Sequence, residues 1–116
     1  MSEFRFTPSS LVLRGGERVL LRFKNVGTAD HEFMAGLNPR SDGGYKDDIF
    51  QGLEVRMLSG SAEGHAMSHG GFGLMVGHGR AGAVEFAVPK RPGTYEFGCF
   101  IVGHYEAGMT GTLTVE

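Results

Sequence analysis

Three side chains that can bind a metal ion lie close together near the carboxyl end of the chain. Cys99, His104 and Met109 follow one another at the spacing C-x4-H-x4-M. Gly103 and Gly108 directly precede the histidine and the methionine, and glycine permits the positive φ angles that a tightly folded ligand loop needs. The spacing therefore predicts a loop that folds back on a single ion.

A fourth ligand must come from elsewhere, and His31 is the best candidate. It opens the apolar segment HEFMAG, directly after the loop from Asn25 to Asp30. Two imidazoles, one thiolate and a weak axial thioether form the coordination set of a mononuclear blue-copper electron-transfer site. We therefore expect one copper ion, held by His31, Cys99, His104 and Met109.

Each of these residues has a simpler explanation when taken alone. A single histidine is more often a surface or core residue than a ligand, and a buried Cys99 or Met109 fills space like other apolar side chains. Zinc accepts imidazole and thiolate donors as well, but thioether is a poor zinc ligand and no carboxylate takes the place of Met109. Since Cys99 is the only cysteine, an internal disulfide, a CxxC motif and a two-copper centre with bridging thiolates are excluded.

The elements that must hold these residues are short strands, because apolar and polar residues alternate along much of the chain. Turn signals separate the alternating segments at Gly15-Gly16, Asn25 to Gly27 and Pro89 to Gly93. Such a pattern predicts an all-β sandwich or barrel. The expected strands are Phe4 to Phe6, Leu11 to Leu13, Arg18 to Lys24, Val84 to Val88, Tyr95 to Cys99 and Leu113 to Val115.

The stretch from Leu37 to Gly79 has a different character. Between Asp47 and Leu58, apolar residues at near-helical spacing follow an acidic start, which predicts one short helix in a long connection. Further on, His65, Met67 and His69, with Met75 and His78 downstream, form a glycine-rich segment that could gather a second, weakly held copper ion. We favour an exposed loop instead, followed by a strand with Phe72, Leu74 and Val76 on one face.

Size and composition place further limits on the function. The 116 residues, with a mass of 12.5 kDa, predict a single domain over 1–116. A net charge of −2 and no basic cluster beyond Lys90-Arg91 exclude nucleic acid as a main partner. No apolar stretch approaches the roughly 18 residues of a membrane span. No signal peptide opens the chain, which suits a cytosolic protein or the mature part of an exported one.

Three longer motifs make the chain similar to the cupredoxins, the family of small blue-copper proteins. The pattern F-x-P-x-x-L-x-L-x-x-G-x-x-V runs from Phe6 to Val19, N-x-G-x-x-x-H-x-F from Asn25 to Phe33, and P-G-T-Y-E-F-x-C from Pro92 to Cys99. The ligand spacings resemble azurin, rusticyanin and auracyanin more than plastocyanin. The run HYEAGM also resembles cupredoxins associated with bacterial copper resistance.

The resemblance implies a Greek-key β-sandwich that carries single electrons by cycling between Cu(II) and Cu(I). It implies a monomer without enzymatic activity that works in the periplasm or elsewhere outside the cytoplasm. Redox partner proteins would dock on an apolar patch around His104, formed by Phe100, Ile101, Val102, Tyr105 and Ala107. Two alternatives stay open: copper sequestration or delivery in copper resistance, and a cupredoxin domain of a larger redox protein.

Two positions depart from the pattern of the family. Val102 stands where relatives often have proline before the Gly-His pair, which puts the rigidity of the ligand loop in question. Glu32 stands where azurin-like proteins often have an asparagine that ties the two ligand segments together. Its carboxylate could accept a hydrogen bond there or tune the copper, but we expect it to point to solvent.

Overall fold

The computed structural model describes residues 1–41, 43–51, 53–57, 63–66 and 72–116. The described residues form an all-β molecule, as the alternating sequence predicts. The strands are β1 (Ser10–Leu13), β2 (Arg18–Lys24), β3 (His31–Pro39), β4 (Tyr45–Asp48), β5 (Arg56–Met57), β6 (Glu63–Ala66), β7 (Phe72–Val76), β8 (Ala81–Ala87), β9 (Gly93–Gly98) and β10 (Thr110–Val115).

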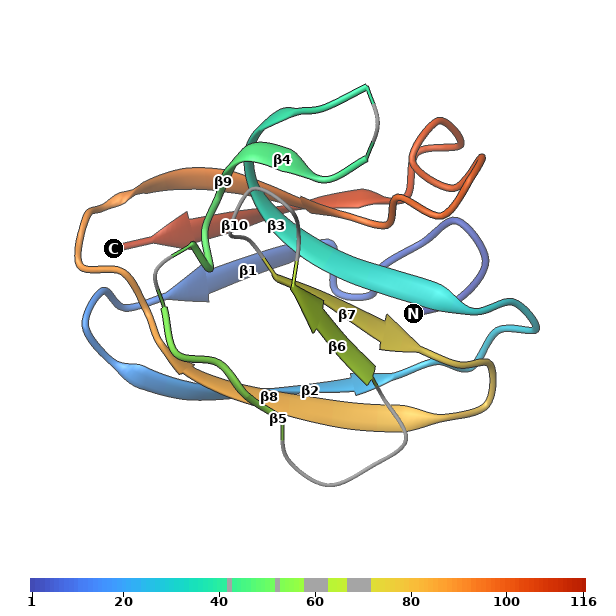
Figure 1. Ribbon diagram of the computed structural model, residues 1–116, viewed down its shortest axis with the longest axis horizontal. Helices are drawn as coiled ribbons and strands as arrows, with labels where there is room; N and C mark the ends of the chain where they lie inside the picture. Colours follow the sequence, from blue (N-terminus) through green and yellow to red (C-terminus); the bar gives the residue numbers. More distant parts are fainter. Residues whose placement is uncertain (42, 52, 58–62, 67–71) are drawn as a thin grey trace.

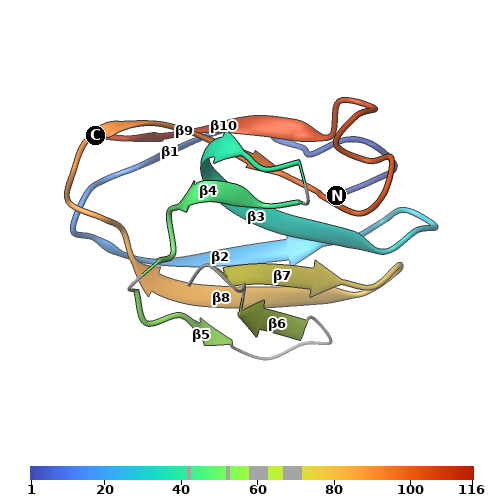
Figure 2. The ribbon, with the colours of Figure 1, turned by 45° about the horizontal axis from the view of Figure 1, so that its top comes forward.

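Two sheets pack against each other as a sandwich (Figures 1 and 2). The larger sheet has the strand order β1-β10-β9-β3-β7-β6, with β4 also paired to β3, and the smaller has the order β2-β8-β5. β1 runs parallel to β10, whereas β10, β9 and β3 are antiparallel neighbours. The Greek-key sandwich is thus confirmed. In the part of the chain that is described, no helix has the length and apolar character to cross a membrane.

Aromatic side chains fill the space between the sheets. Phe33 on β3 and Phe97 on β9 have ring centroids 5.4 Å apart, and Phe50 meets Phe86 of the smaller sheet at 5.0 Å. All four are almost fully buried, and each such side chain stabilises the fold by roughly 1.5–3 kcal/mol. Because this core lies directly beneath β3 and β9, it fixes the two strands from which the candidate ligands start.

The helix predicted within residues 47–58 is wrong. β4 ends at Asp48, whose carboxylate accepts the Phe50 N–H at 2.8 Å and so closes a turn. The N–H of Ile49, the residue directly after Asp48, donates to the Ala35 carbonyl of β3 at 2.9 Å. The acidic start therefore forms an Asx turn, and Ile49 and Phe50, two of the apolar residues that suggested a helix, enter the core from a loop.

The other two predicted strands, one after the histidine-rich segment and one near the amino terminus, have different outcomes. Phe72, Leu74 and Val76 lie on β7 as predicted, and β6 pairs with it, while Met67 and His69 lie outside the described residues. The weak second copper site, the alternative to the exposed loop that we favour, therefore stays an untested hypothesis. The expected strand from Phe4 to Phe6 is wrong: Ser2 and Arg5 form an isolated bridge around Phe4, whose φ is +58°.

Candidate metal centre

Strand pairing brings the candidate ligands to one end of the sandwich. His31 is the first residue of β3, and Cys99 directly follows β9. The two strands are antiparallel, with Met34 opposite Gly98, so the end of β9 lies beside the start of β3. The loop from Cys99 to Met109, which carries His104, closes over this end before β10 begins (Figures 1 and 2).

The donor atoms of three of the four predicted ligands converge. Nδ1 of His31 lies 3.2 Å from Nδ1 of His104, which in turn lies 3.4 Å from Sγ of Cys99. One donor atom from each residue falls within 4.8 Å of the others. Two nitrogens 3.2 Å apart, each at a usual metal–imidazole distance of about 2.0–2.1 Å, subtend roughly 100° at a shared ion. This arrangement fits a first-row transition metal with little movement.

Met109, the fourth predicted ligand, closes the loop through its backbone. Its N–H donates to the His104 carbonyl at 3.1 Å, and its carbonyl accepts the Cys99 N–H at 3.2 Å. Its side chain is fully buried. Gly103 and Gly108 have φ of +87° and +96°, which confirms why glycines stand before the histidine and the methionine.

Burial sets the protonation of the two innermost groups. Burial raises the pKa of the Cys99 thiol, and the amides of Glu32 and Ile101 oppose that rise by favouring the thiolate. The Glu32 N–H lies 3.3 Å from the sulfur. Burial also lowers the pKa of His31, which keeps its imidazole neutral and able to act as a ligand. Binding of a metal to this set therefore has to displace the thiol proton.

The side chain of Glu32 joins the two segments that carry the ligands. It is only 8% exposed, and its Oε1 accepts the Phe100 N–H at 3.4 Å. The expectation that Glu32 points to solvent is therefore wrong. The carboxylate instead bridges the start of β3 and the residue after Cys99, in the place where an asparagine is often found in azurin-like proteins.

Asn25 braces the loop that leads into His31. Its side-chain amide donates to the carbonyls of Ala29 and Val76, both at 2.9 Å, and its Oδ1 accepts the Gly27 N–H at 2.9 Å. The residue is almost completely buried. Its hydrogen bonds fasten the loop to the end of β7, which pairs with the first residues of β3.

A second brace, which the sequence did not indicate, holds the ligand loop. The hydroxyls of Tyr45 and Tyr105 both donate to Oε1 of Glu96, at 2.9 and 2.7 Å. Burial and the nearby carboxylate raise the pKa of Tyr105 to about 12. Its ring stacks on Phe100 with centroids 4.7 Å apart. Neither Tyr105 nor Phe100 therefore lies free on the surface around His104.

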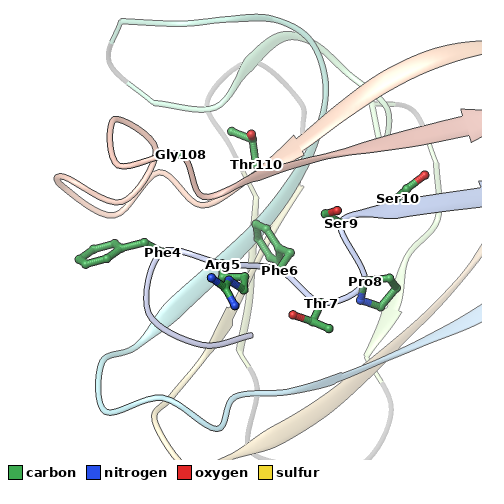
Figure 3. A pocket seen from close by; sticks show the side chains of 9 residues that line it. All are labelled: Phe4, Arg5, Phe6, Thr7, Pro8, Ser9, Ser10, Gly108 and Thr110. Atoms are coloured by element: carbon green, nitrogen blue, oxygen red, sulfur yellow. The ribbon is translucent and has the colours of Figure 1, made fainter.

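Only part of the expected apolar patch faces outward. Val102 is 95% exposed and Ala107 is also exposed, whereas Ile101 packs partly against the core. His104 itself is 8% exposed, with the ring of Phe4 edge-on at 5.2 Å. An open groove of about 580 Å³ runs between the amino-terminal segment and the end of the ligand loop, as Figure 3 shows.

Comparison with known proteins finds no matching family model but clear relatives. The copper-resistant cuproprotein CopI of Rubrivivax gelatinosus is 31% identical over 96% of this chain, and that of Pseudomonas aeruginosa is 28% identical over all of it. The chain spans 59% of the length of the first and 73% of the second. Auracyanin-B of Chloroflexus aurantiacus is 54% identical over 41 residues, which are 35% of this chain and 17% of that protein.

Solved structures agree on the fold. An auracyanin from Roseiflexus castenholzii has a TM-score of 0.67 at 21% identity, and the match covers 99% of this chain and 90% of the auracyanin chain. Auracyanin B has a TM-score of 0.65 at 24% identity, over 99% of this chain and 82% of its own. A multicopper oxidase from Aquifex aeolicus has a TM-score of 0.62 at 15% identity, but this chain matches only 21% of its length.

Proposed function

The chain has the cupredoxin fold, and from this premise we propose that it binds one copper ion and carries single electrons between redox partners. The observation that carries the proposal is the convergence of His31, Cys99 and His104 at one buried end of the sandwich. The fully buried Met109 would supply the fourth, weaker donor. Bound copper would accept and release one electron by cycling between Cu(II) and Cu(I).

The residues of this chain contribute by holding the donors still. Asn25, Glu32 and Glu96 tie the ligand-bearing segments to the sheets through hydrogen bonds. The positions of donors fixed in this way change little when the ion goes from Cu(II) to Cu(I). A small change in geometry favours fast electron exchange. Four protein donors also leave no position for a substrate, and we therefore propose no enzymatic activity for the chain by itself.

Electrons would enter and leave beside His104. This ligand lies next to the exposed Val102 and Ala107, and a small apolar surface suits weak, short-lived docking of a redox protein. We also propose that residues 1–116 act as one domain, as a monomer and outside the cytoplasm. The single domain rests on the size of the chain, and the other two properties rest on the likeness to cupredoxins.

The first test is spectroscopic. Cu(II) added to the metal-free protein should produce an intense visible band from thiolate-to-copper charge transfer, together with the EPR spectrum of a single copper centre. Cys99→Ser should lose the band, because imidazole and thioether give no such absorption. A colourless complex in the unchanged protein would contradict the copper–thiolate assignment and leave a zinc site as the alternative. Colour that survives the loss of Cys99 would also contradict it.

Copper sequestration or delivery is the second candidate function, because two relatives bear the name copper-resistant cuproprotein. Voltammetry and chelation separate the two functions. An electron carrier should show a reversible one-electron couple and retain its copper against a chelator in both oxidation states. Ready release of Cu(I) to a chelator, without a reversible couple, would favour delivery.

A further inference from the structure

The amino-terminal segment, residues 1–6, lies across the end of the sandwich that holds the candidate ligands. The Met1 carbonyl accepts the Val26 N–H at 2.9 Å, and the bridge between Ser2 and Arg5 turns the segment sharply at Phe4. Figure 3 shows Phe4 projecting beside the loop that carries Gly108. The turn thus brings Glu3 and Phe4 to the two candidate histidine ligands.

The carboxylate of Glu3 is held in place by backbone amides. Its Oε1 accepts the N–H of Thr28 at 2.7 Å and that of Ala29 at 2.9 Å. A glutamate carboxylate is an anion at neutral pH, and an anion is the better acceptor for both amides. Both amides belong to the loop that leads into His31, and the carboxylate is therefore fixed relative to that ring.

The same oxygen faces an unsatisfied ring nitrogen. Oε1 of Glu3 lies 3.4 Å from Nε2 of His31. Within the described part of the chain, this Nε2 is the only buried side-chain nitrogen or oxygen that lacks a hydrogen-bond partner. When Nδ1 of a neutral imidazole binds a metal, Nε2 carries the proton, and a buried donor without an acceptor is destabilising. Glu3 is positioned to accept that proton's hydrogen bond after a small shift.

We propose that Glu3 is a positioning residue of the metal centre, whose carboxylate accepts the Nε2–H of His31 and fixes the orientation of that ring. The inference rests on the proposed copper function and deepens it. Outer carboxylates of this kind hold a histidine ligand in one tautomer and make it a stronger donor. The anion also favours the more positive Cu(II) state, so Glu3 lowers the reduction potential.

Three variants test this role. Glu3→Gln keeps an oxygen for the two amides but removes the charge, whereas Glu3→Ala removes the acceptor altogether. Glu17→Gln removes the same charge from an exposed position in the turn between β1 and β2, at the opposite end of the sandwich. It serves as the matched control for a general change in net charge.

The reduction potential is the first measurement. Glu3→Gln should raise the ratio of Cu(I) to Cu(II) at a fixed applied potential by several-fold to about tenfold, and tenfold corresponds to about 59 mV for one electron. Glu17→Gln should change it less than twofold, and Glu3→Ala should in addition speed copper loss to a chelator. A shift in Glu3→Gln no larger than in Glu17→Gln would overturn the tuning role.

The imidazole NMR signals provide a test that needs no redox chemistry. In the metal-free and Cu(I)-loaded protein, the Nε2–H proton of His31 should be protected from solvent exchange, and Glu3→Ala should increase its exchange rate at least tenfold. Unchanged exchange would overturn the hydrogen bond itself. If the unchanged protein gave no blue copper centre, the proposed function would fail, while the metal-free spectra would still decide whether Glu3 holds His31.

Discussion

Asn25 and Glu32 bind no metal in our proposal, yet they fix the residues that do. Asn25 connects the loop before His31 to β7, and Glu32 connects β3 to the residue after Cys99. Both side chains are buried. Polar groups in such positions are costly to leave unpaired, so their substitution should affect stability and metal retention in separable ways.

Replacing Asn25 should destabilise the whole domain. Asn25→Ala removes three hydrogen bonds, each with a net value of about 0.5–1.5 kcal/mol, and takes this donor from the buried Val76 carbonyl and the partly buried Ala29 carbonyl. We expect the free energy of unfolding to fall by about 2–4 kcal/mol in urea denaturation of the metal-free protein. Asn25→Asp keeps the acceptor for Gly27 but cannot donate, and should lose nearly as much. A loss below about 1 kcal/mol in both variants would contradict the bracing role.

Replacing Glu32 should act mainly on the metal centre. Glu32→Ala breaks the side-chain contact with Phe100 but leaves the backbone N–H that faces the Cys99 sulfur. Copper should therefore bind with its charge-transfer band intact and dissociate several-fold faster to a chelator. Glu32→Gln, whose amide oxygen can accept the same hydrogen bond, should restore most of the retention. Equal dissociation rates for the unchanged protein and Glu32→Ala would refute this account.

The ligand residues and their braces differ in how far the sequence predicts them. Cys99, His104 and Met109 lie within eleven residues, and their chemistry and spacing are visible in the sequence. Glu3 and His31 are 28 positions apart, and Tyr45 and Glu96 are 51 apart. Glutamate and tyrosine are common on surfaces, so only the folded chain brings these pairs together. Glu32 was noticed in the sequence, but its burial depends on two strands meeting.

At the level of strands, the predictions depend on which faces are buried. β2 alternates between exposed and half-buried residues, and its predicted bounds, Arg18 to Lys24, are those observed. β3 lies inside the larger sheet, and its first six residues are all buried. Alternation disappears in a strand covered on both faces. Sequence periodicity therefore predicts β2 and leaves β3, the strand that begins with His31, without a clear signal.

We expect a redox partner to dock on the exposed part of the ligand loop. Val102→Glu or Ala107→Glu places a charge on the exposed part of the loop and should slow electron exchange with an apolar-docking partner about tenfold. The visible and EPR spectra should not change, because neither side chain is a ligand. Val12→Glu adds the same charge on exposed β1 and should leave the rate within twofold. Stopped-flow kinetics that fail to separate these variants would place docking on another face.

Across the whole molecule, we expect one tight copper site. The centre near His31 contains the only thiolate of the chain, whereas the segment with His65 and His69 offers imidazole and thioether donors alone. Calorimetric titration should saturate tightly at one ion per chain, and any further binding should be weak, colourless and reduced by His65→Ala with His69→Ala. A second tight equivalent that this double variant abolishes would shift the function toward copper storage or delivery.

The separation of the ligands along the chain also affects when the centre can form during biosynthesis. His31 and His104 are 73 residues apart. Cys99 and Met109 are added to the growing chain only after the residues of β1 to β9 have been synthesised. The loop that holds them closes when β10 takes its place between β9 and β1. A nascent chain that has not yet reached Cys99 contains His31 but has no thiolate that could retain a copper ion. Metal insertion therefore follows the synthesis of β10 and its entry into the larger sheet.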